Sequence, residues 1–396
     1  MTQPRIAWLL TSAFFYWQPL MQSVTKRFPQ TRVFTSRWHG FAPGLEGTFD
    51  LEQVGKRKII KLSKAKNSYG NNFTYLPLSV VGRLLKFKPD VVFSNAFGVW
   101  TILALLFQWV GGWKVVIAYE GSSPGVDYRN SRLRLLLRRL MVKAAAACIT
   151  NSQAGKTYLI DCLNADGRRV FAQPYEVPGA ASLEKTVSAF ETGPLKIDLP
   201  KFDATVARPI FLFVGSTIPR KGIQLLLQAC VQLKLQQVTD YTLVVVGDGE
   251  QRAELEHFSQ KDGLTESVQW VGRVDYEQVG HYFQAADVFV LPTLEDTWGM
   301  VVLEAMALGT PVLCSYLAGA SELVVEGQNG YCFDPRDAEG TAKTMLRFIQ
   351  DPQLAGVLGT QAKQLMAQKY NPEVAADFLA DVTAAVLSTA PVREAA

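Results

Sequence analysis

The stretch LPTLEDTWGMVVLEAMALGTPV, residues 291–312, determines how the rest of the chain can be interpreted. It begins as the end of an apolar strand, breaks at the acidic turn 295–297, and continues with apolar residues at helical spacing. Gly309 and Pro311 predict the end of that helix and the start of the next strand. The turn therefore places the backbone N–H groups of residues 298–300 at a helix N-terminus, where a phosphate group is favoured.

Two carboxylates are expected to flank this phosphate position. Asp296 lies in the turn, and Glu304 follows it eight residues later in the helix. A buried pair of carboxylates is costly unless hydrogen-bond donors contact it. The hydroxyl groups of a ribose and of a sugar ring would supply such donors.

The spacing of these two acids resembles the acid-x7-Glu signature of the retaining glycosyltransferases of family 4. That family has the GT-B fold, an α/β architecture of two Rossmann-like domains facing a central cleft. The resemblance implies that Asp296 contacts the donor sugar and that Glu304 contacts the ribose of the nucleotide. The family more often has Glu at the first position, and Glu295 is the alternative for the sugar contact. The resemblance is strong over residues 209–345 and concerns only the fold over residues 1–180.

A second loop with phosphate chemistry occurs in PIFLFVGSTIPRKG, residues 209–222. A strand is followed by Arg220 and Lys221, which lead directly into a helix, and cations at that position suit a diphosphate. The resemblance implies that these residues hold the phosphates of the donor, with Arg220 compensating for Ser216, which stands where the family has Arg. The turn at Gly247 and the segment VQWVGRV, residues 268–274, follow at the spacing of the family, and the latter resembles the segment that reads the base.

The expected donor site therefore consists of two groups of residues. The catalytic residues are Lys221, Arg220, Asp296 and Glu304, and the donor-binding residues are Gly215, Ser216, Gly247, Gly272, Arg273, Glu295, Thr297, Trp298, Gly299 and Met300. Three His and five scattered Cys favour neither a metal centre nor a disulfide framework. No cofactor and no metal are expected, and the nucleotide-sugar is the donor substrate.

Charge is distributed unevenly along the chain. Residues 1–185 contain 25 Lys and Arg against 10 Asp and Glu, a balance of +15, whereas residues 186–396 have a balance of −11. The first half is therefore expected to face an anionic partner. Six basic residues lie between Lys56 and Lys66, a run that is usually a solvated surface.

The predicted helix NSRLRLLLRRLMVKAAAA, residues 130–147, is amphipathic. One face holds Leu133, Leu136, Leu137, Leu140, Met141 and Ala144, the other holds Arg132, Arg138, Arg139 and Lys143, and Arg134 lies at the border. The helix is either an ordinary Rossmann helix with a solvated basic face or a helix at an anionic membrane surface. Each basic residue near such a surface contributes about 1 kcal/mol of attraction. The uneven charge favours the membrane.

Residues that could contact an acceptor are less clearly marked. The loop TSAFFYWQP, residues 11–19, either shapes an acceptor pocket or is packing alone. The family commonly has His after the strand that ends at Tyr119, where this sequence has Glu120. The candidate acceptor or membrane residues are Tyr16, Trp17, Glu120, Arg132, Arg138, Arg139 and Lys143.

The predicted domains are an acceptor-binding Rossmann-like domain (1–185), a linker (186–208), a nucleotide-sugar-binding Rossmann-like domain (209–370) and a C-terminal segment that crosses back to the first domain (371–396). No apolar run reaches the roughly 18 residues of a membrane span. The longest, VWTILALLFQWV at residues 99–110, is interpreted as a core helix. A cytoplasmic protein, peripheral on the inner face of a membrane, is expected.

The predicted function is the transfer of a hexose, with retention, from a nucleotide-diphosphate sugar to a hydroxyl acceptor. A membrane lipid or glycolipid is the favoured acceptor, and a polysaccharide or soluble acceptor is the alternative. A nucleotide-sugar epimerase with the GT-B fold and a sugar-binding module without chemistry are the alternatives from other classes. No nucleic-acid partner is expected.

Overall fold

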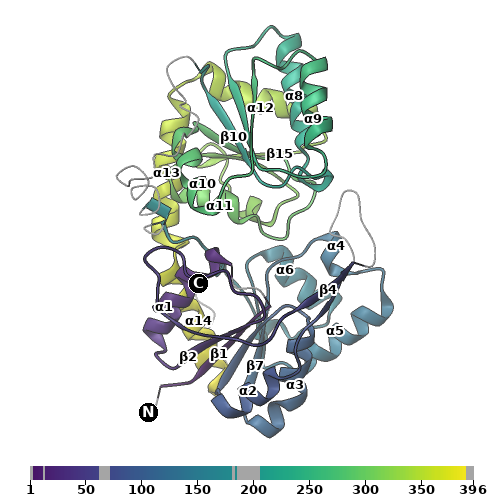
Figure 1. Cartoon of the computed structure of the whole chain (residues 1–396), viewed down its shortest axis with the longest axis vertical. Coiled ribbons are helices and arrows are strands. Elements are labelled where there is room, and N and C mark those ends of the chain that lie inside the picture. The colour runs from purple at the N-terminus through teal and green to yellow at the C-terminus, as the bar shows by residue number, and fades with distance from the viewer. Residues whose placement is uncertain (1–2, 12–13, 62–71, 181–182, 185–205, 389–396) are drawn as a thin grey trace. The chain divides into compact units, whose positions relative to one another are not determined.

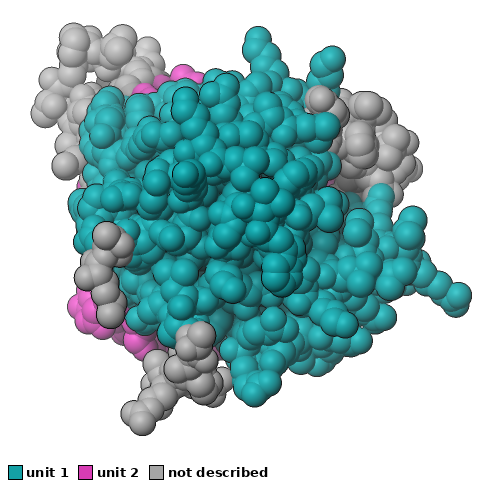
Figure 2. Space-filling model, turned by 90° about the horizontal axis from the view of Figure 1, so that it is seen from below, with its two compact units in different colours: residues 1–64, 70–179, 370–396 teal, residues 65–69, 180–369 magenta. Residues whose placement is uncertain are grey.

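The computed structural model describes residues 3–11, 14–61, 72–180, 183–184 and 206–388. The chain divides into two compact units, which Figure 2 colours separately. Unit 1 consists of residues 1–64, 70–179 and 370–396, and unit 2 of residues 65–69 and 180–369. Most of the predicted linker (186–205) and the end of the C-terminal segment (389–396) lie outside the described residues.

Unit 1 is built on a parallel sheet with the strand order β3-β2-β1-β6-β7-β8-β9. Its strands are β1 (Ile6–Leu10), β2 (Thr31–Thr35), β3 (Asp50–Gln53), β6 (Val91–Asn95), β7 (Lys114–Tyr119), β8 (Ala147–Thr150) and β9 (Val170–Ala172), and β4 (Lys58–Lys61) pairs with β5 (Asn72–Tyr75) in a separate hairpin. Its helices are α1 (Gln18–Arg27), α2 (Val80–Phe87), α3 (Val99–Gly111), α4 (Pro124–Asp127), α5 (Arg132–Ala144), α6 (Gln153–Thr157) and α14 (Pro372–Leu387), with the short turns η1 (Phe15–Trp17), η2 (Tyr158–Cys162) and η3 (Gly167–Arg169).

Unit 2 repeats this architecture with the strand order β12-β11-β10-β13-β14-β15 (Figure 1). Its strands are β10 (Ile210–Val214), β11 (Thr242–Val246), β12 (Val268–Gly272), β13 (Val288–Leu291), β14 (Val312–Ser315) and β15 (Gly330–Phe333). Its helices are α8 (Ile223–Leu235), α9 (Arg252–Lys261), α10 (Tyr276–Ala285), α11 (Met300–Ala307), α12 (Ala338–Gln350) and α13 (Leu354–Lys369), with the turns η4 (Pro219–Lys221) and η5 (Gly319–Leu323).

Apolar strands explain why both sheets are parallel and covered on both faces. Strands β1, β10 and β11 read IAWLL, IFLFV and TLVVV, and every residue in them is buried. Such continuous apolar runs are typical of parallel strands between two layers of helices. The predicted α/β class with two Rossmann-like domains is confirmed.

Each sheet reverses its strand order at one point. In unit 1 the point lies between β1 and β6, and in unit 2 it lies between β10 and β13. At such a switch point the loops that follow the two strands diverge, and ligands of open α/β sheets bind there, outside the carboxyl ends of the strands. The fold therefore marks one candidate binding position in each unit.

The last helix, α14, returns the chain to unit 1, where it packs on α1. The Ser23 hydroxyl donates a hydrogen bond to Glu373 over 3.3 Å, and Arg27 forms an ion pair with Asp377. Asn371 caps α14 by accepting a hydrogen bond from the backbone N–H of Val374. Residues near the two ends of the described chain thus stabilise one unit together.

The helix α3 differs from its prediction as a core helix. Trp100, Ala104 and Leu105 are buried, but the last two turns project apolar side chains outwards, and Trp109 is 89% exposed. The sequence missed this because the run is apolar on all sides, so periodicity could not show which part is covered. Among the described residues, no helix is both long enough and apolar enough to span a bilayer.

Candidate functional site

The two loops at the switch point of unit 2 are joined by charged side chains. Lys221 Nζ lies 2.5 Å from Asp296 Oδ2, and a guanidinium nitrogen of Arg220 lies 3.9 Å from the same oxygen. Arg220 also donates a hydrogen bond to the backbone carbonyl of Glu295 over 2.5 Å. The structure therefore brings together the cationic loop after β10 and the acidic turn after β13, which lie 75 residues apart in the sequence.

Backbone contacts fix this junction. The N–H of Leu294 donates to the carbonyl of Arg220 over 2.8 Å. Gly222 has a φ of +70°, and a Cβ atom there would lie 2.0 Å from the carbonyl oxygen of Pro292. Only glycine permits this close approach without strain, so the position that starts α8 is held directly against the loop after β13.

The helix α11 begins at Met300, directly after the acidic turn. Its N-cap residue, Gly299, has a φ of +97° and carries no side chain that could cap the first turn. A helix N-terminus of this kind favours an anionic group through its amide donors and its dipole. The geometry agrees with the position expected for a phosphate, while the role itself remains a prediction.

Glu304 lies inside α11 and is almost completely buried. Burial raises the pKa of its carboxyl group, and the hydroxyl of Tyr276, which donates to Glu304 Oε1 over 2.7 Å, opposes that shift. Tyr276 starts α10 and was not predicted as a site residue. Its hydroxyl partly meets the need for hydrogen-bond donors that a buried carboxyl group creates.

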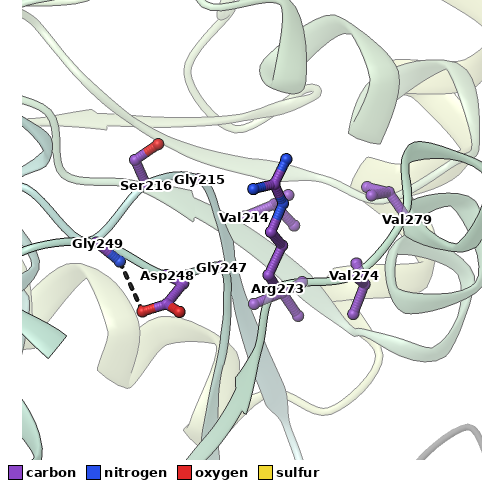
Figure 3. A pocket seen from close by; sticks show the side chains of 10 residues that line it. Val214, Gly215, Ser216, Gly247, Asp248, Gly249, Arg273, Val274 and Val279 are labelled. Carbon is purple, nitrogen blue, oxygen red and sulfur yellow. Dashed lines mark hydrogen bonds between the residues drawn. The ribbon is translucent and has the colours of Figure 1, made fainter.

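A pocket of about 670 Å³ opens at the carboxyl ends of β10, β11 and β12. Gly247, with a φ of +135°, keeps the first two loops in contact, since a Cβ atom there would lie 1.8 Å from the carbonyl oxygen of Gly215. Figure 3 shows the Arg273 side chain projecting between Ser216 and Val279. A pocket of this size accommodates a ligand as large as a nucleotide.

The predicted donor residues fall into three neighbouring groups. Gly215, Ser216, Gly247 and Arg273 line the pocket; Arg220, Lys221, Glu295 and Asp296 form the charged junction; and Thr297, Trp298, Gly299, Met300 and Glu304 follow the acidic turn, while Gly272 ends β12.

In unit 1, the predicted acceptor residues Tyr16, Trp17 and Glu120 lie at the carboxyl end of the sheet. Trp17 is buried, with its ring centroid 5.7 Å from that of Trp8 and 6.1 Å from that of Tyr175. Tyr16 is only half-buried, and its ring lies 6.1 Å from that of Trp17. The Trp17 side chain thus packs in the interior of unit 1, as one of the two interpretations of this loop expects.

The helix α5 buries Met141 and Val142 but exposes most of its leucines together with most of its basic residues. Its leucines point outwards, with Leu133 77% and Leu140 57% exposed. Arg138, expected at a membrane surface, points inwards instead and donates to the carbonyl of Asp127 and to the hydroxyl of Tyr158. An arginine can lie inside when its donors are satisfied and its plane lies over aromatic rings, as over Phe97 here.

Four residues of unit 1 with functional potential were missed. Asn95 ends β6, Asn151 follows β8, and Tyr175 and Glu176 follow β9. The available signal was a polar residue directly after a short apolar strand, in ACITN and in VFAQPYE. That signal is weak because most loops begin with polar residues.

Comparison with known proteins finds sequence similarity mainly in unit 2. Residues 198–365 match the family model described as glycosyl transferases group 1. The alpha-D-kanosaminyltransferase of Streptomyces kanamyceticus is 29% identical over 175 residues, which are 44% of this chain and 45% of that protein. The lipopolysaccharide core biosynthesis glycosyltransferase LpsE of Rhizobium meliloti is 28% identical over 181 residues, 46% of this chain and 51% of that protein.

The chain thus spans about half the length of these curated relatives. The likeness in fold extends further. The structure of HepE from Anabaena in complex with UDP-glucose has a TM-score of 0.68 and 18% identity, covering 97% of this chain and 100% of that one. Residues 198–365 are therefore similar in sequence to glycosyl transferases group 1, and the whole chain has the GT-B fold.

Proposed function

We propose that this protein is a retaining glycosyltransferase that moves a hexose from a nucleoside-diphosphate sugar to a hydroxyl group of a membrane lipid or glycolipid. The observation that carries the donor part is the charged junction of Arg220, Lys221 and Asp296. It lies in the loop that starts at the pocket residues Gly215 and Ser216. The family match over residues 198–365 supports this proposal, and so does the UDP-glucose bound in the related HepE structure.

The charged groups have separate tasks in this proposal. Lys221, Arg220 and the N-terminus of α11 contact the diphosphate, the pocket at β10–β12 holds the nucleoside, and the carboxyl groups of Asp296 and Glu304 contact hydroxyls. In the free protein Asp296 pairs with Lys221. A bound diphosphate supplies a competing anion, and the hydroxyls of the donor sugar then become partners for Asp296.

The reaction follows from where charge develops. The bond between the anomeric carbon and the diphosphate oxygen breaks, and the acceptor oxygen bonds to the same face of that carbon. The acceptor hydroxyl proton passes to the departing phosphate. The cations stabilise the negative charge that accumulates on the leaving group, an effect that typically contributes several kcal/mol to catalysis. The proposed chemistry requires no metal or further cofactor.

Calorimetric titration with UDP-, GDP- and ADP-glucose tests the donor. We expect one nucleotide to bind, and we expect nucleoside diphosphate to be released only when a lipid acceptor is added. Retention is read from the anomeric configuration of the product by NMR. Interconversion of the nucleotide-sugar without acceptor would favour the epimerase instead, and absence of binding by all three nucleotides would contradict the proposal.

The membrane part rests on one exposed surface of unit 1, called the α3–α5 surface below. The two helices lie side by side, and the Gln108 side chain donates to the carbonyl of Ala144 over 3.3 Å (Figure 1). Its exposed apolar residues are Leu106, Trp109, Val110, Leu133, Leu136 and Leu140, and its exposed basic residues are Arg132, Arg139 and Lys143.

Apolar and basic side chains together are the chemistry of an interfacial anchor. Exposed leucine and tryptophan enter the acyl boundary, and basic residues attract anionic lipid headgroups. At about 1 kcal/mol each, the three basic residues contribute about 3 kcal/mol. The related protein LpsE acts in lipopolysaccharide core biosynthesis, which supports a lipid-linked acceptor. The protein would then work as a peripheral protein on the inner face of a membrane.

Flotation with vesicles of phosphatidylcholine alone and with added phosphatidylglycerol tests this surface. We expect binding to the anionic vesicles, and a loss of about a hundredfold when Arg132, Arg139 and Lys143 are all replaced by Ala. Trp109→Ala combined with Leu133→Ser should also weaken binding, whereas Leu235→Ser, at an exposed leucine of unit 2, serves as the control. Equal and negligible binding to both vesicles would contradict the membrane proposal and favour a soluble or polysaccharide acceptor.

A further inference from the structure

The carboxyl end of the sheet in unit 1 holds a group of polar side chains that the donor chemistry does not use. Asn95 ends β6 and donates from Nδ2 to Glu120 Oε1 over 3.2 Å, and Glu120 follows β7. Asn151, after β8, donates from Nδ2 to Glu176 Oε2 over 3.1 Å. We call these four residues and Tyr175 the unit 1 polar cluster. They lie at the carboxyl ends of four neighbouring parallel strands, close to the switch point where this fold binds ligands.

Asn151 holds the backbone of the cluster in place through its side-chain oxygen. Its Oδ1 accepts hydrogen bonds from the backbone N–H groups of Tyr175 and Glu176, at 2.9 and 3.0 Å. Asn151 and Glu176 are buried, whereas Asn95 and Glu120 are half-buried. The cluster therefore extends from the interior of unit 1 to a rim that solvent reaches at Asn95 and Glu120.

Besides these polar groups, the buried hydroxyl of Tyr175 also points to a ligand at this position. Its side chain is 0% exposed, and its hydroxyl has no hydrogen-bond partner among the residues that the structure describes. That hydroxyl lies within electrostatic reach of Glu176, Glu120 and Tyr16. A buried hydroxyl without a partner costs about 1–3 kcal/mol. Such a cost is explained when the hydroxyl meets its partner in the bound state.

The charge state of the cluster follows from burial. Burial, and secondly the carboxylate of Glu120, raise the pKa of Glu176 well above its usual value, although the amide of Asn151 opposes the shift. Burial therefore favours the uncharged form of Glu176. None of the five residues is Lys or Arg, so the cluster itself supplies no cation for a phosphate group.

Aromatic side chains surround these polar groups. Trp17 packs on Tyr175, Tyr16 is half-buried, and Phe14 lies stacked on Tyr16 with ring centroids 5.8 Å apart and is itself 36% exposed. Ligand sites commonly combine aromatic walls with a few placed polar groups. A sugar ring has hydroxyls to donate to a carboxylate and apolar C–H faces to pack against aromatic rings.

We propose that the unit 1 polar cluster binds the acceptor as an uncharged sugar ring, with sugar hydroxyls donating to Glu120 and the Tyr175 hydroxyl donating to the ring's oxygens. The proposal rests on the proposed function and sharpens it, since the acceptor becomes a glycan or the sugar part of a glycolipid. We expect the part of the acceptor that binds here to carry no phosphate group, since the cluster itself contains no Lys or Arg. Glu176 and Asn151 are positioning residues that orient Glu120 and Tyr175.

The test uses the full-length protein and an array of immobilised glycans with neutral, amino-bearing and phosphorylated sugars. We expect binding to neutral glycans, at least tenfold weaker binding for Glu120→Gln, and no change for Glu46→Gln, which alters an exposed carboxylate elsewhere in unit 1. Tyr175→Phe is the decisive variant. It removes a hydroxyl that has no hydrogen-bond partner within the described part of the chain, so the thermal midpoint should not fall although glycan binding weakens several-fold.

Four results would overturn this proposal: preference for phosphorylated glycans, preference for amino-bearing ones, no binding to any glycan, or unchanged binding by both variants. A fifth contradicting result would be that Glu120→Gln weakens the binding of UDP-glucose but not that of UDP. The cluster would then contact the sugar of the donor and not the acceptor. Calorimetry with UDP, GDP and ADP on the same variants separates the two proposals. Unchanged nucleotide binding leaves the proposed function standing whichever way the glycan result falls.

Discussion

The two sheets of this protein reverse at equivalent points, and the side chains beside those points differ in chemistry. In unit 2 the loop after β10 holds Arg220 and Lys221, which pair with Asp296 of the loop after β13. In unit 1 Asn95 ends β6, at the switch point, and contacts Glu120, which follows the next strand, β7. The overall charge runs the other way, with +15 for residues 1–185 and −11 for residues 186–396.

This contrast separates two kinds of electrostatic information. Net charge describes the surface of a unit, and therefore what attracts the unit from a distance. The few side chains at a switch point determine which group is bound there. A basic half of the chain can therefore approach an anionic membrane with one face and bind an uncharged sugar at another position.

Removing the cation at the switch point of unit 2 should have the largest effect. Lys221→Ala should lower turnover by about 10²–10³-fold, because one donor to a developing negative charge contributes about 2.7–4 kcal/mol. The loss of folding stability should be smaller, since Arg220 remains 3.9 Å from Asp296. Nucleoside diphosphate release and thermal unfolding measure the two effects.

The matched control is Lys343→Ala, at an exposed lysine of α12 in the same unit, which should leave turnover unchanged. Near wild-type turnover of Lys221→Ala would show that the cationic switch point is not where the leaving group is stabilised, and the contrast between the two units would lose its functional meaning.

The rigidity of the unit 2 junction gives the next largest effect. Gly222→Ala should destabilise unit 2 by at least about 1–2 kcal/mol, because its φ of +70° is unfavourable for alanine. The contact with the Pro292 carbonyl adds to this cost. Gly356→Ala is the control, since it lies on the exposed side of α13 with open space around it and should stabilise by about 0.5–1 kcal/mol. Urea unfolding measures both, and equal stabilities would contradict the account of the junction.

The smallest effect concerns the buried carboxyl group of unit 1. The pKa of Glu176 is raised on folding, so the unfolded chain loses this proton first as the pH rises above about 4.5. The wild-type protein therefore loses stability with rising pH through this group, up to the pKa in the folded state. Glu176→Gln, which cannot ionise, should be more stable relative to wild type at pH 8 than at pH 5.

Thermal midpoints at the two pH values check this sign, with Glu46→Gln as the control that shows no such difference. A constant difference between Glu176→Gln and wild type at both pH values would mean that the carboxyl group titrates normally. The unit 1 polar cluster would then carry two negative charges, and the contrast with unit 2 would become sharper.

Local motifs of the donor site could be predicted because their meaning depends on neighbours in the sequence. GSTIPRKG and LEDTWG each contain a strand end, a turn and a helix start, so the positions of Lys221 and Asp296 within their loops followed directly. The ion pair between these residues did not follow, because it depends on how strands 75 residues apart are ordered in the sheet. Tyr276 was missed for the same reason.

The helix α5 shows a second limit of what the sequence could predict. A helical wheel divided residues 130–147 into an apolar and a basic face, but neither face as a whole is the covered one, since Met141 of the first is buried and Arg138 of the second points inwards. In the structure Arg138 is drawn inwards by the carbonyl of Asp127 and the hydroxyl of Tyr158, and the leucines point outwards. An inward arginine is possible only where partners from other segments satisfy its donors.

The sequence by itself determined the fold class, the two repeats of strand, loop and helix, and the positions of the cationic loop and the acidic turn of the second half, because periodicity and turn residues act over short distances. The tertiary structure alone decided that Lys221 meets Asp296, that leucines of α5 and Trp109 of α3 share one exposed surface, and that Glu120, Tyr175 and Glu176 meet at one sheet end. These contacts join segments far apart in the chain, and only the strand order and packing of each unit bring them within reach.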